Sequence, residues 1–190
     1  IKIIWFTFFL IFQILIAQNI SYYSMKGENV ADVSTIEGLT FTCRVDGLKN
    51  NGDTVVLLHG FPETSRMWMK LIKILDENGF KVIAPDQRGY SKGARPEKIN
   101  DYNVTNLTND VFNIVDAFGL DKFHLVGHDW GSAVGWTVSA FNKDRVLSYS
   151  ALSVPHVDAF SNAIVNDDIQ TKKSYYIDLF KIKYLSLIHI

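Results

Sequence analysis

Short apolar runs that alternate with amphipathic segments are the feature that most limits how this chain can fold. Continuous apolar runs of this length are typical of parallel strands buried on both faces. The predicted strands are residues 39–45, 54–58, 81–84, 123–126 and 146–154, and the predicted helices are residues 65–78, 104–118 and 132–141. Right-handed crossovers should then give an α/β fold with a largely parallel sheet and helices on both faces. Residues 39–45 are expected at an edge of this sheet.

Composition indicates a globular core and excludes several classes of function. The 190 residues are 47% hydrophobic, and 19 Lys and Arg against 20 Asp and Glu give a formal charge of −1. This balance excludes a strongly basic nucleic-acid-binding protein. The single cysteine, Cys43, excludes an internal disulfide framework, and the five histidines are too scattered to indicate a metal site. We therefore predict no nucleic-acid partner and no metal.

The apolar segment over residues 1–24 has two interpretations. Residues 3–17 are almost entirely apolar and follow Lys2, as in a signal peptide or a membrane anchor. The alternative is that Met25 is the true start and that the preceding residues are translated upstream sequence. The first interpretation predicts a secreted or membrane-anchored protein, with membrane contact only through this segment, and the second predicts a cytoplasmic protein.

The rest of the chain divides into a core and a helical extension. Residues 25–156 are interpreted as a partial α/β core, and one helix is expected over residues 157–183. Residues 185–190 resemble a translated sequencing adaptor, so the last residues of the 157–190 region are suspected to be non-native. We expect the gene product to be longer than this chain.

The most informative motif follows a predicted strand, opens a predicted helix, and reads Gly127-His128-Asp129-Trp130-Gly131. Functional residues in such sheets gather at the carboxyl ends of the strands. The pattern has the form of a nucleophile elbow, in which two glycines permit a strained turn that raises the middle side chain above the sheet. That middle residue is Asp129, so the predicted nucleophile is a carboxylate. The alternative is that Asp129 only caps the following helix.

A second motif follows the predicted strand before it and reads His59-Gly60-Phe61-Pro62. This architecture places half of its oxyanion hole at that point. Gly60 permits a close approach of the backbone, and Pro62 stiffens the turn. The backbone N–H groups of Phe61 and Trp130 are therefore predicted to converge on one oxygen.

A third motif, DQRGYS at residues 86–91, follows the predicted strand at 81–84. We interpret Asp86 and Arg88 as a structural ion pair or as anchors of the loop, rather than as catalytic groups.

Together, the three motifs resemble those of the epoxide hydrolases of the α/β-hydrolase fold. The matching segments are HGFPE at 59–63, DQRGYS at 86–91 and GHDWG at 127–131, within a resemblance that covers roughly residues 36–183. Haloalkane dehalogenases share Asp-Trp at the elbow but usually have Asn where this chain has Phe61. Fluoroacetate dehalogenases tend to have Arg where this chain has Trp130. Both differences favour an epoxide hydrolase.

The resemblance implies a hydrolysis in two steps that needs no cofactor. An aspartate carboxylate, whose ordinary pKa is about 3.9, is charged at neutral pH and suits attack by Asp129 on a strained saturated carbon. Water then hydrolyses the resulting ester while the Phe61 and Trp130 amides stabilise the oxyanion. The implied partners are a small electrophilic organic substrate, most simply an epoxide, and water. The alternatives are a haloalkane dehalogenase and a non-catalytic binding module on the same fold.

The resemblance also implies that residues 157–190 begin a cap and that essential parts lie beyond Ile190. These parts are the last strands of the sheet, an acid and a histidine that activates water. None of the five histidines is interpreted as that base, and Tyr175 and Tyr176 are interpreted as packing or rim residues. This chain alone is therefore expected to be inactive.

Overall fold

The computed structural model describes residues 20–181. Most of the predicted signal or anchor segment and the adaptor-like end lie outside these residues. Among the helices described, none combines the length and the apolar character needed to cross a membrane.

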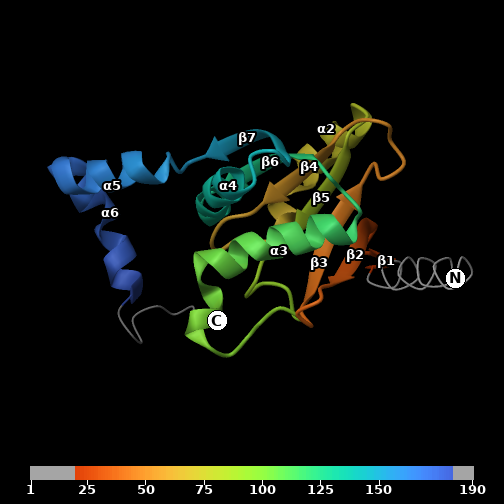
Figure 1. The fold of residues 1–190 in the computed structure, drawn as a ribbon, viewed down its shortest axis with the longest axis horizontal. Coiled ribbons are helices and arrows are strands. Elements are labelled where there is room, and N and C mark those ends of the chain that lie inside the picture. The colour runs from red at the N-terminus through yellow and green to blue at the C-terminus, as the bar shows by residue number, and fades with distance from the viewer. Residues whose placement is uncertain (1–19, 182–190) are drawn as a thin grey trace, which may run out of the picture.

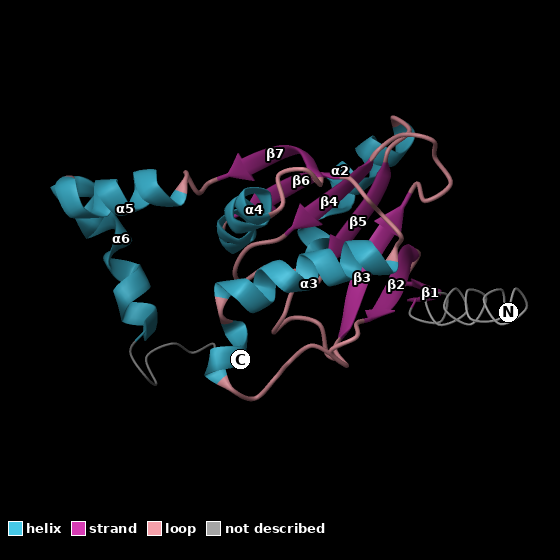
Figure 2. Cartoon of the chain, viewed as in Figure 1, coloured by secondary structure: helices cyan, strands magenta, loops and turns pink. Residues whose placement is uncertain are grey.

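The described residues form one mixed sheet, shown as arrows in Figures 1 and 2. Its strands are β1 (Ile20–Met25), β2 (Glu28–Ser34), β3 (Thr40–Asp46), β4 (Thr54–Leu58), β5 (Lys81–Pro85), β6 (Phe123–His128) and β7 (Val146–Leu152). They lie in the order β1-β2-β3-β5-β4-β6-β7. Strands β5, β4, β6 and β7 are mutually parallel, whereas β1, β2 and β3 pair antiparallel, and β3 joins β5 antiparallel.

Helices cover both faces of this sheet. The helical elements are η1 (Ser65–Trp68), α2 (Met69–Glu77), η2 (Ile99–Tyr102), α3 (Val104–Ala117), α4 (Trp130–Phe141), α5 (Val157–Asn166) and α6 (Asp168–Lys181). In β4, Val55 and Leu57 pack with η1 and α2, whereas Val56 and Leu58 pack with α3 and α4. This alternation follows from the two-residue period of a strand. It explains why Val55 to Leu58 are all apolar, and the layers confirm the predicted α/β class.

The amino-terminal strands differ from the prediction. The strand predicted over 39–45 at an edge is β3, and it lies inside the sheet between β2 and β5. Strands β1 and β2 were not predicted. Their apolar residues are interrupted by polar ones, and β1 overlaps the end of the apolar segment over residues 1–24. A turn at Lys26 and Gly27, both with positive φ, joins them. The sheet therefore begins at Ile20, five residues before the expected core boundary.

The helical extension also differs from the prediction. The single helix expected over 157–183 is two helices, α5 and α6, because the backbone at Asp167 is extended. The Asp167 carboxylate accepts hydrogen bonds from the N–H groups of Ile169 and Gln170, and so starts α6. Figure 1 shows both helices beyond the end of β7, away from the sheet.

The charged residues of the 86–91 loop anchor it through separate partners. Asp86 accepts hydrogen bonds from the backbone and hydroxyl of Ser65 and lies 3.5 Å from Arg44. Arg88 instead makes a bidentate pair with Asp110 of α3, with both N···O distances at 2.7 Å. The predicted anchoring role is therefore confirmed, but the two residues do not pair with each other.

We expect Arg88→Met to lower the free energy of unfolding by about 3–5 kcal/mol, because it leaves the buried Asp110 carboxylate without its partner. Urea denaturation followed by circular dichroism measures the change. Lys73→Met is the control, since Lys73 and Glu77 are an exposed pair 3.8 Å apart whose loss should cost less than about 0.5 kcal/mol. A loss below about 1 kcal/mol for Arg88→Met would contradict the anchoring role.

Candidate active site

The elbow between β6 and α4 is built by backbone lying against backbone. Asp129 has φ 54° and ψ −121°, a conformation that costs a non-glycine residue about 1–3 kcal/mol. A Cβ on Gly127 would lie 2.5 Å from the carbonyl oxygen of Gly131, and a Cβ on Gly131 would overlap the carbonyl of Leu58. The two glycines are therefore required because their Cα atoms touch neighbouring main chain.

The turn at residues 59–62 after β4, which was predicted to provide half of an oxyanion hole and is called the oxyanion turn below, lies directly beside the elbow. Leu58 and Gly127 are register partners in the parallel pair β4–β6, so the two strand ends leave the sheet together. The backbone N–H of Phe61 donates a hydrogen bond to Asp129 Oδ1 at 2.9 Å. A Cβ on Gly60 would lie 2.5 Å from Asp129 Cβ, which explains the glycine there. The structure thus brings together two motifs that are nearly 70 residues apart in the sequence.

Trp130 is the first residue of α4 and is 61% exposed. The first N–H groups of a helix lack partners one turn earlier. Those of Ser132 and Ala133 donate to the Asp129 carbonyl, whereas no acceptor for the Trp130 N–H is described within residues 20–181. Asp129 occupies the N-cap position, but its carboxylate makes no capping hydrogen bond and accepts from Phe61 instead. The alternative interpretation of Asp129 as a simple cap is therefore not supported by its contacts.

His59 holds the oxyanion turn to the 86–91 loop. Its side chain is fully buried, with Nε2 accepting from the N–H of Gln87 at 2.9 Å and Nδ1 lying 2.9 Å from the carbonyl oxygen of Gly60. Because the Gln87 amide can only donate, Nε2 carries no proton and Nδ1–H donates to Gly60. The Gln87 side chain also donates to the His59 carbonyl, and the Tyr90 ring meets the imidazole edge to face at 4.6 Å. Burial lowers the pKa of His59 below its ordinary value, consistent with a neutral ring.

The remaining described histidines lie at other points of the fold. His124 contacts Ser148 at 2.8 Å near the amino end of β6, and His156 accepts from the N–H of Asp158 at the start of α5. His128 precedes the elbow aspartate, and within residues 20–181 its buried Nδ1 has no hydrogen-bond partner. Tyr175 and Tyr176 are exposed on α6. His124 Nε2 also lies 3.5 Å from Asp53 Oδ2, and His156 Nδ1 lies 3.6 Å from Asp158 Oδ2. No contact described for residues 20–181 joins either pair to Asp129.

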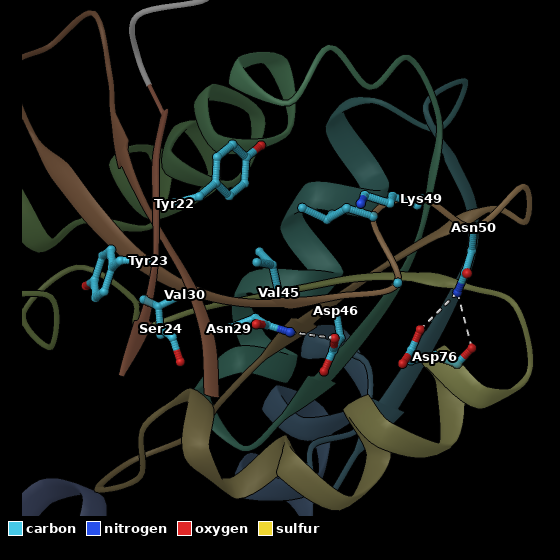
Figure 3. A pocket seen from close by; sticks show the side chains of 12 residues that line it. Tyr22, Tyr23, Ser24, Asn29, Val30, Val45, Asp46, Lys49, Asn50 and Asp76 are labelled. Atoms are coloured by element: carbon cyan, nitrogen blue, oxygen red, sulfur yellow. Dashed lines mark hydrogen bonds between the residues drawn. The ribbon is translucent and has the colours of Figure 1, made fainter. Parts of the chain in front are cut away.

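A hollow of about 540 Å³ lies at the opposite edge of the sheet. Figure 3 shows its lining, which includes Tyr22 of β1, Asp46 of β3 and Asp76 of α2. Asp46 pairs with the start of β5, so this hollow is at the amino ends of the parallel strands, whereas Asp129 follows a carboxyl end. Its amides are already paired, Asn29 with Asp46 and Asn50 with Asp76. It is therefore separate from the elbow.

Comparison with known proteins adds an independent finding. A family model described as alpha/beta hydrolase fold matches residues 53–187. The chain is 35% identical over 158 residues to the AB hydrolase superfamily protein YfhM of Bacillus subtilis. The match covers 83% of this chain and 54% of that protein. The chain is also 45% identical over 101 residues to epoxide hydrolase A of Mycobacterium tuberculosis. That match covers 53% of this chain and 31% of that protein.

Solved structures show the same relationship. An epoxide hydrolase from metagenomes of hot environments superposes with a TM-score of 0.74 at 31% identity, covering 81% of this chain and 51% of that one. Epoxide hydrolase VrEH1 from Vigna radiata superposes with a TM-score of 0.67 at 30% identity. The match covers 88% of this chain and 51% of that one. The chain thus spans about half the length, or less, of the proteins it matches.

We expect the free energy of unfolding to fall as the pH drops below about 6.5, where the unfolded His59 begins to take up a proton that the folded ring resists. The pKa of His59 is lower in the folded protein, so its contribution to the free energy of unfolding is complete above the pKa of the unfolded chain. The contribution is lost as the pH falls toward the folded pKa, at up to about 1.4 kcal/mol per pH unit. Urea denaturation at pH 7.5, 6.5 and 5.5 measures it.

His59→Asn should reduce this pH dependence, whereas His156→Asn, which replaces a half-exposed ring, should keep it. An unchanged pH dependence in His59→Asn would show that the buried imidazole is not its source.

Proposed function

This chain belongs to the α/β-hydrolase fold family, and on that basis we propose that it is the amino-terminal part of an epoxide hydrolase with Asp129 as nucleophile. The observation that carries the proposal is the 2.9 Å hydrogen bond from the Phe61 amide to Asp129 Oδ1. It orients a carboxylate on a strained turn at the carboxyl end of a parallel strand. The relatives named epoxide hydrolase support the substrate class.

In the proposed first step, the Asp129 carboxylate opens the epoxide. Because Phe61 holds Oδ1, the other carboxylate oxygen, Oδ2, is the proposed attacking atom. A bond forms between Oδ2 and an epoxide carbon, the ring C–O bond breaks, and its electron pair goes to the ring oxygen. That oxygen takes a proton from an acid outside the described residues or from water, and the product is an alkyl ester of Asp129.

In the proposed second step, water hydrolyses the ester. Oδ1 is then the carbonyl oxygen and already lies against the Phe61 amide, where the oxyanion forms as water adds. With the Trp130 amide at the start of α4, the site would offer two donors, each contributing about 3–4 kcal/mol to transition-state stabilisation. The water proton passes to a histidine held by an acid, which we assign to the part of the relatives that this chain does not span. The oxyanion then collapses, and the bond between the Asp129 carboxyl carbon and the alkyl oxygen breaks with its electron pair going to that oxygen. The oxygen takes the proton back from the histidine to give the diol, and the Asp129 carboxyl group loses a proton to solvent, which restores the carboxylate.

We expect the longer protein, with its distal histidine replaced by glutamine, to accumulate the ester, because the first step does not need the base that activates water. Mass spectrometry after mixing with styrene oxide should show a mass gain of one whole epoxide, located on the peptide that contains Asp129. Asp129→Ala in the same background is the control and should gain nothing.

The same experiment separates the alternatives. An alkyl halide that labels Asp129 with its alkyl group alone, while no epoxide adds, would favour a haloalkane dehalogenase. Absence of any adduct would favour a non-catalytic binding module. An adduct on Ser132, whose side chain is fully buried, would contradict Asp129 as nucleophile.

We also expect residues 1–190 alone to release no diol above the level of their own Asp129→Ala variant, because the proposed base and acid are contributed from elsewhere. Gas chromatography of styrene oxide incubations measures the diol. Diol release that is lost on Asp129→Ala would show that this chain already contains a complete site.

A further inference from the structure

We propose that Ser132 and Tyr149 together position the nucleophile by fixing the backbone of the elbow, an inference that rests on the proposed role of Asp129. We call this pair the Ser132–Tyr149 bracket. Ser132 lies in the first turn of α4, and Tyr149 lies on the neighbouring strand β7. Neither residue touches substrate in this proposal, and both act through Asp129.

The elbow needs such a bracket because the strained turn interrupts the sheet. Strand β6 pairs in parallel with β7 up to His128 and Leu152, and at Asp129 the backbone turns away into α4. The Asp129 N–H still reaches the carbonyl oxygen of Leu152 at 3.1 Å. Gly127 pairs with Ala151 and His128 pairs with Leu152 in this ladder, so the pairing of the two strands ends directly beside the elbow.

The Ser132 hydroxyl supplies partners for main-chain groups of Gly127 and Leu152. Its Oγ lies 2.6 Å from the Gly127 carbonyl oxygen and 2.8 Å from that of Leu152, and it accepts from the Leu152 N–H at 3.1 Å. The hydroxyl has a single hydrogen, so it donates to one of these two carbonyls at a time. Ser132 is 0% exposed, so bulk water cannot replace it. Alanine here would leave the Leu152 N–H without this acceptor and the Gly127 carbonyl without this donor.

Tyr149 closes the bracket from the other side. Its hydroxyl donates to the backbone carbonyl of Ser132 at 2.7 Å. A Cβ on Gly135 would lie 2.7 Å from the Tyr149 hydroxyl oxygen, so glycine is what lets the ring lie against α4. Trp136 packs edge to face on the same ring at 5.0 Å. Ser132 thus fixes the start of α4 to β7 twice, through its side chain to Leu152 and through its carbonyl to Tyr149.

This arrangement constrains Asp129 directly. The Asp129 carbonyl accepts from the N–H of Ser132 at 2.8 Å, so a shift of Ser132 moves the residue that carries the carboxylate. The positive φ of Asp129 is strained, and strained conformations persist only when surrounding contacts hold them. Loosening the bracket would let the elbow relax and turn Oδ2 away from its line of attack, without removing any group that binds substrate.

The test uses the longer protein with the distal histidine replaced by glutamine, and follows ester formation on Asp129 with styrene oxide in a single turnover. Ser132→Ala should lower the maximal rate of ester formation at least tenfold, with less than a threefold change in the epoxide concentration that gives half of that rate. Ser132→Cys, which keeps the size and a weak donor, should restore part of the rate. Tyr149→Phe should lower it several-fold. All rates are measured at least 15 °C below the melting temperature of each variant.

Ser139→Ala is the matched control, because Ser139 lies on the same helix and, among the residues described, its buried hydroxyl has no hydrogen-bond partner. It should form ester within twofold of the parent. If the parent forms ester and the Ser132 and Tyr149 variants match it, the bracket has no positioning role. If the parent forms none, the proposed function itself fails. If Ser132→Ala does not fold, the Cys and Phe variants decide the question by the same rates.

Discussion

The close approach of main chain at Gly131 is the constraint on which the rest of the site depends. Its Cα lies against the carbonyls of Leu58 and His59, so the start of α4 rests directly on the end of β4. That contact is possible because β4 and β6 are neighbours in the sheet although residues 59–122 separate them in sequence. A side chain at this point would separate the Phe61 amide from the Asp129 carboxylate and abolish the bond between them.

Polar contacts around this crossing keep the strained elbow in place. His59 joins the oxyanion turn to the loop after β5 through a neutral, buried imidazole, and Ser132 joins the elbow to the end of β7. Arg88 joins the same loop to α3 through Asp110. Buried donors and acceptors are costly when unpaired, so each of these links also fixes the geometry of the groups it satisfies. The carboxyl ends of four parallel strands are held as one unit.

The elements and motifs were predictable from the sequence to the extent that they are local. The buried runs that became β4, β5 and β6, and the glycine patterns around Asp129 and Gly60, depend on short-range rules. The partners across the fold were not predictable, since Arg88 pairs with Asp110 and Asp86 with Ser65 through contacts that only the folded chain creates. Strands β1 and β2 lacked the continuous apolar run that marks a strand buried on both faces, and in β2 the buried Val30, Ala31 and Val33 stand among polar residues. Ser132 gave no sign of its role, because a serine in the first turn of a helix is common.

The contacts described also separate two tasks within the proposed mechanism. The links described for Asp129, through Phe61, His59 and Ser132, are formed among residues 20–181. The two histidine–carboxylate pairs of this part of the chain, His124 with Asp53 and His156 with Asp158, are joined to Asp129 by no contact described for residues 20–181. Attack by the carboxylate and activation of water therefore depend on different parts of the protein in our proposal. A variant that disturbs the first part should lose ester formation, whereas one that disturbs the second should trap the ester, and this difference follows from where the supporting hydrogen bonds lie.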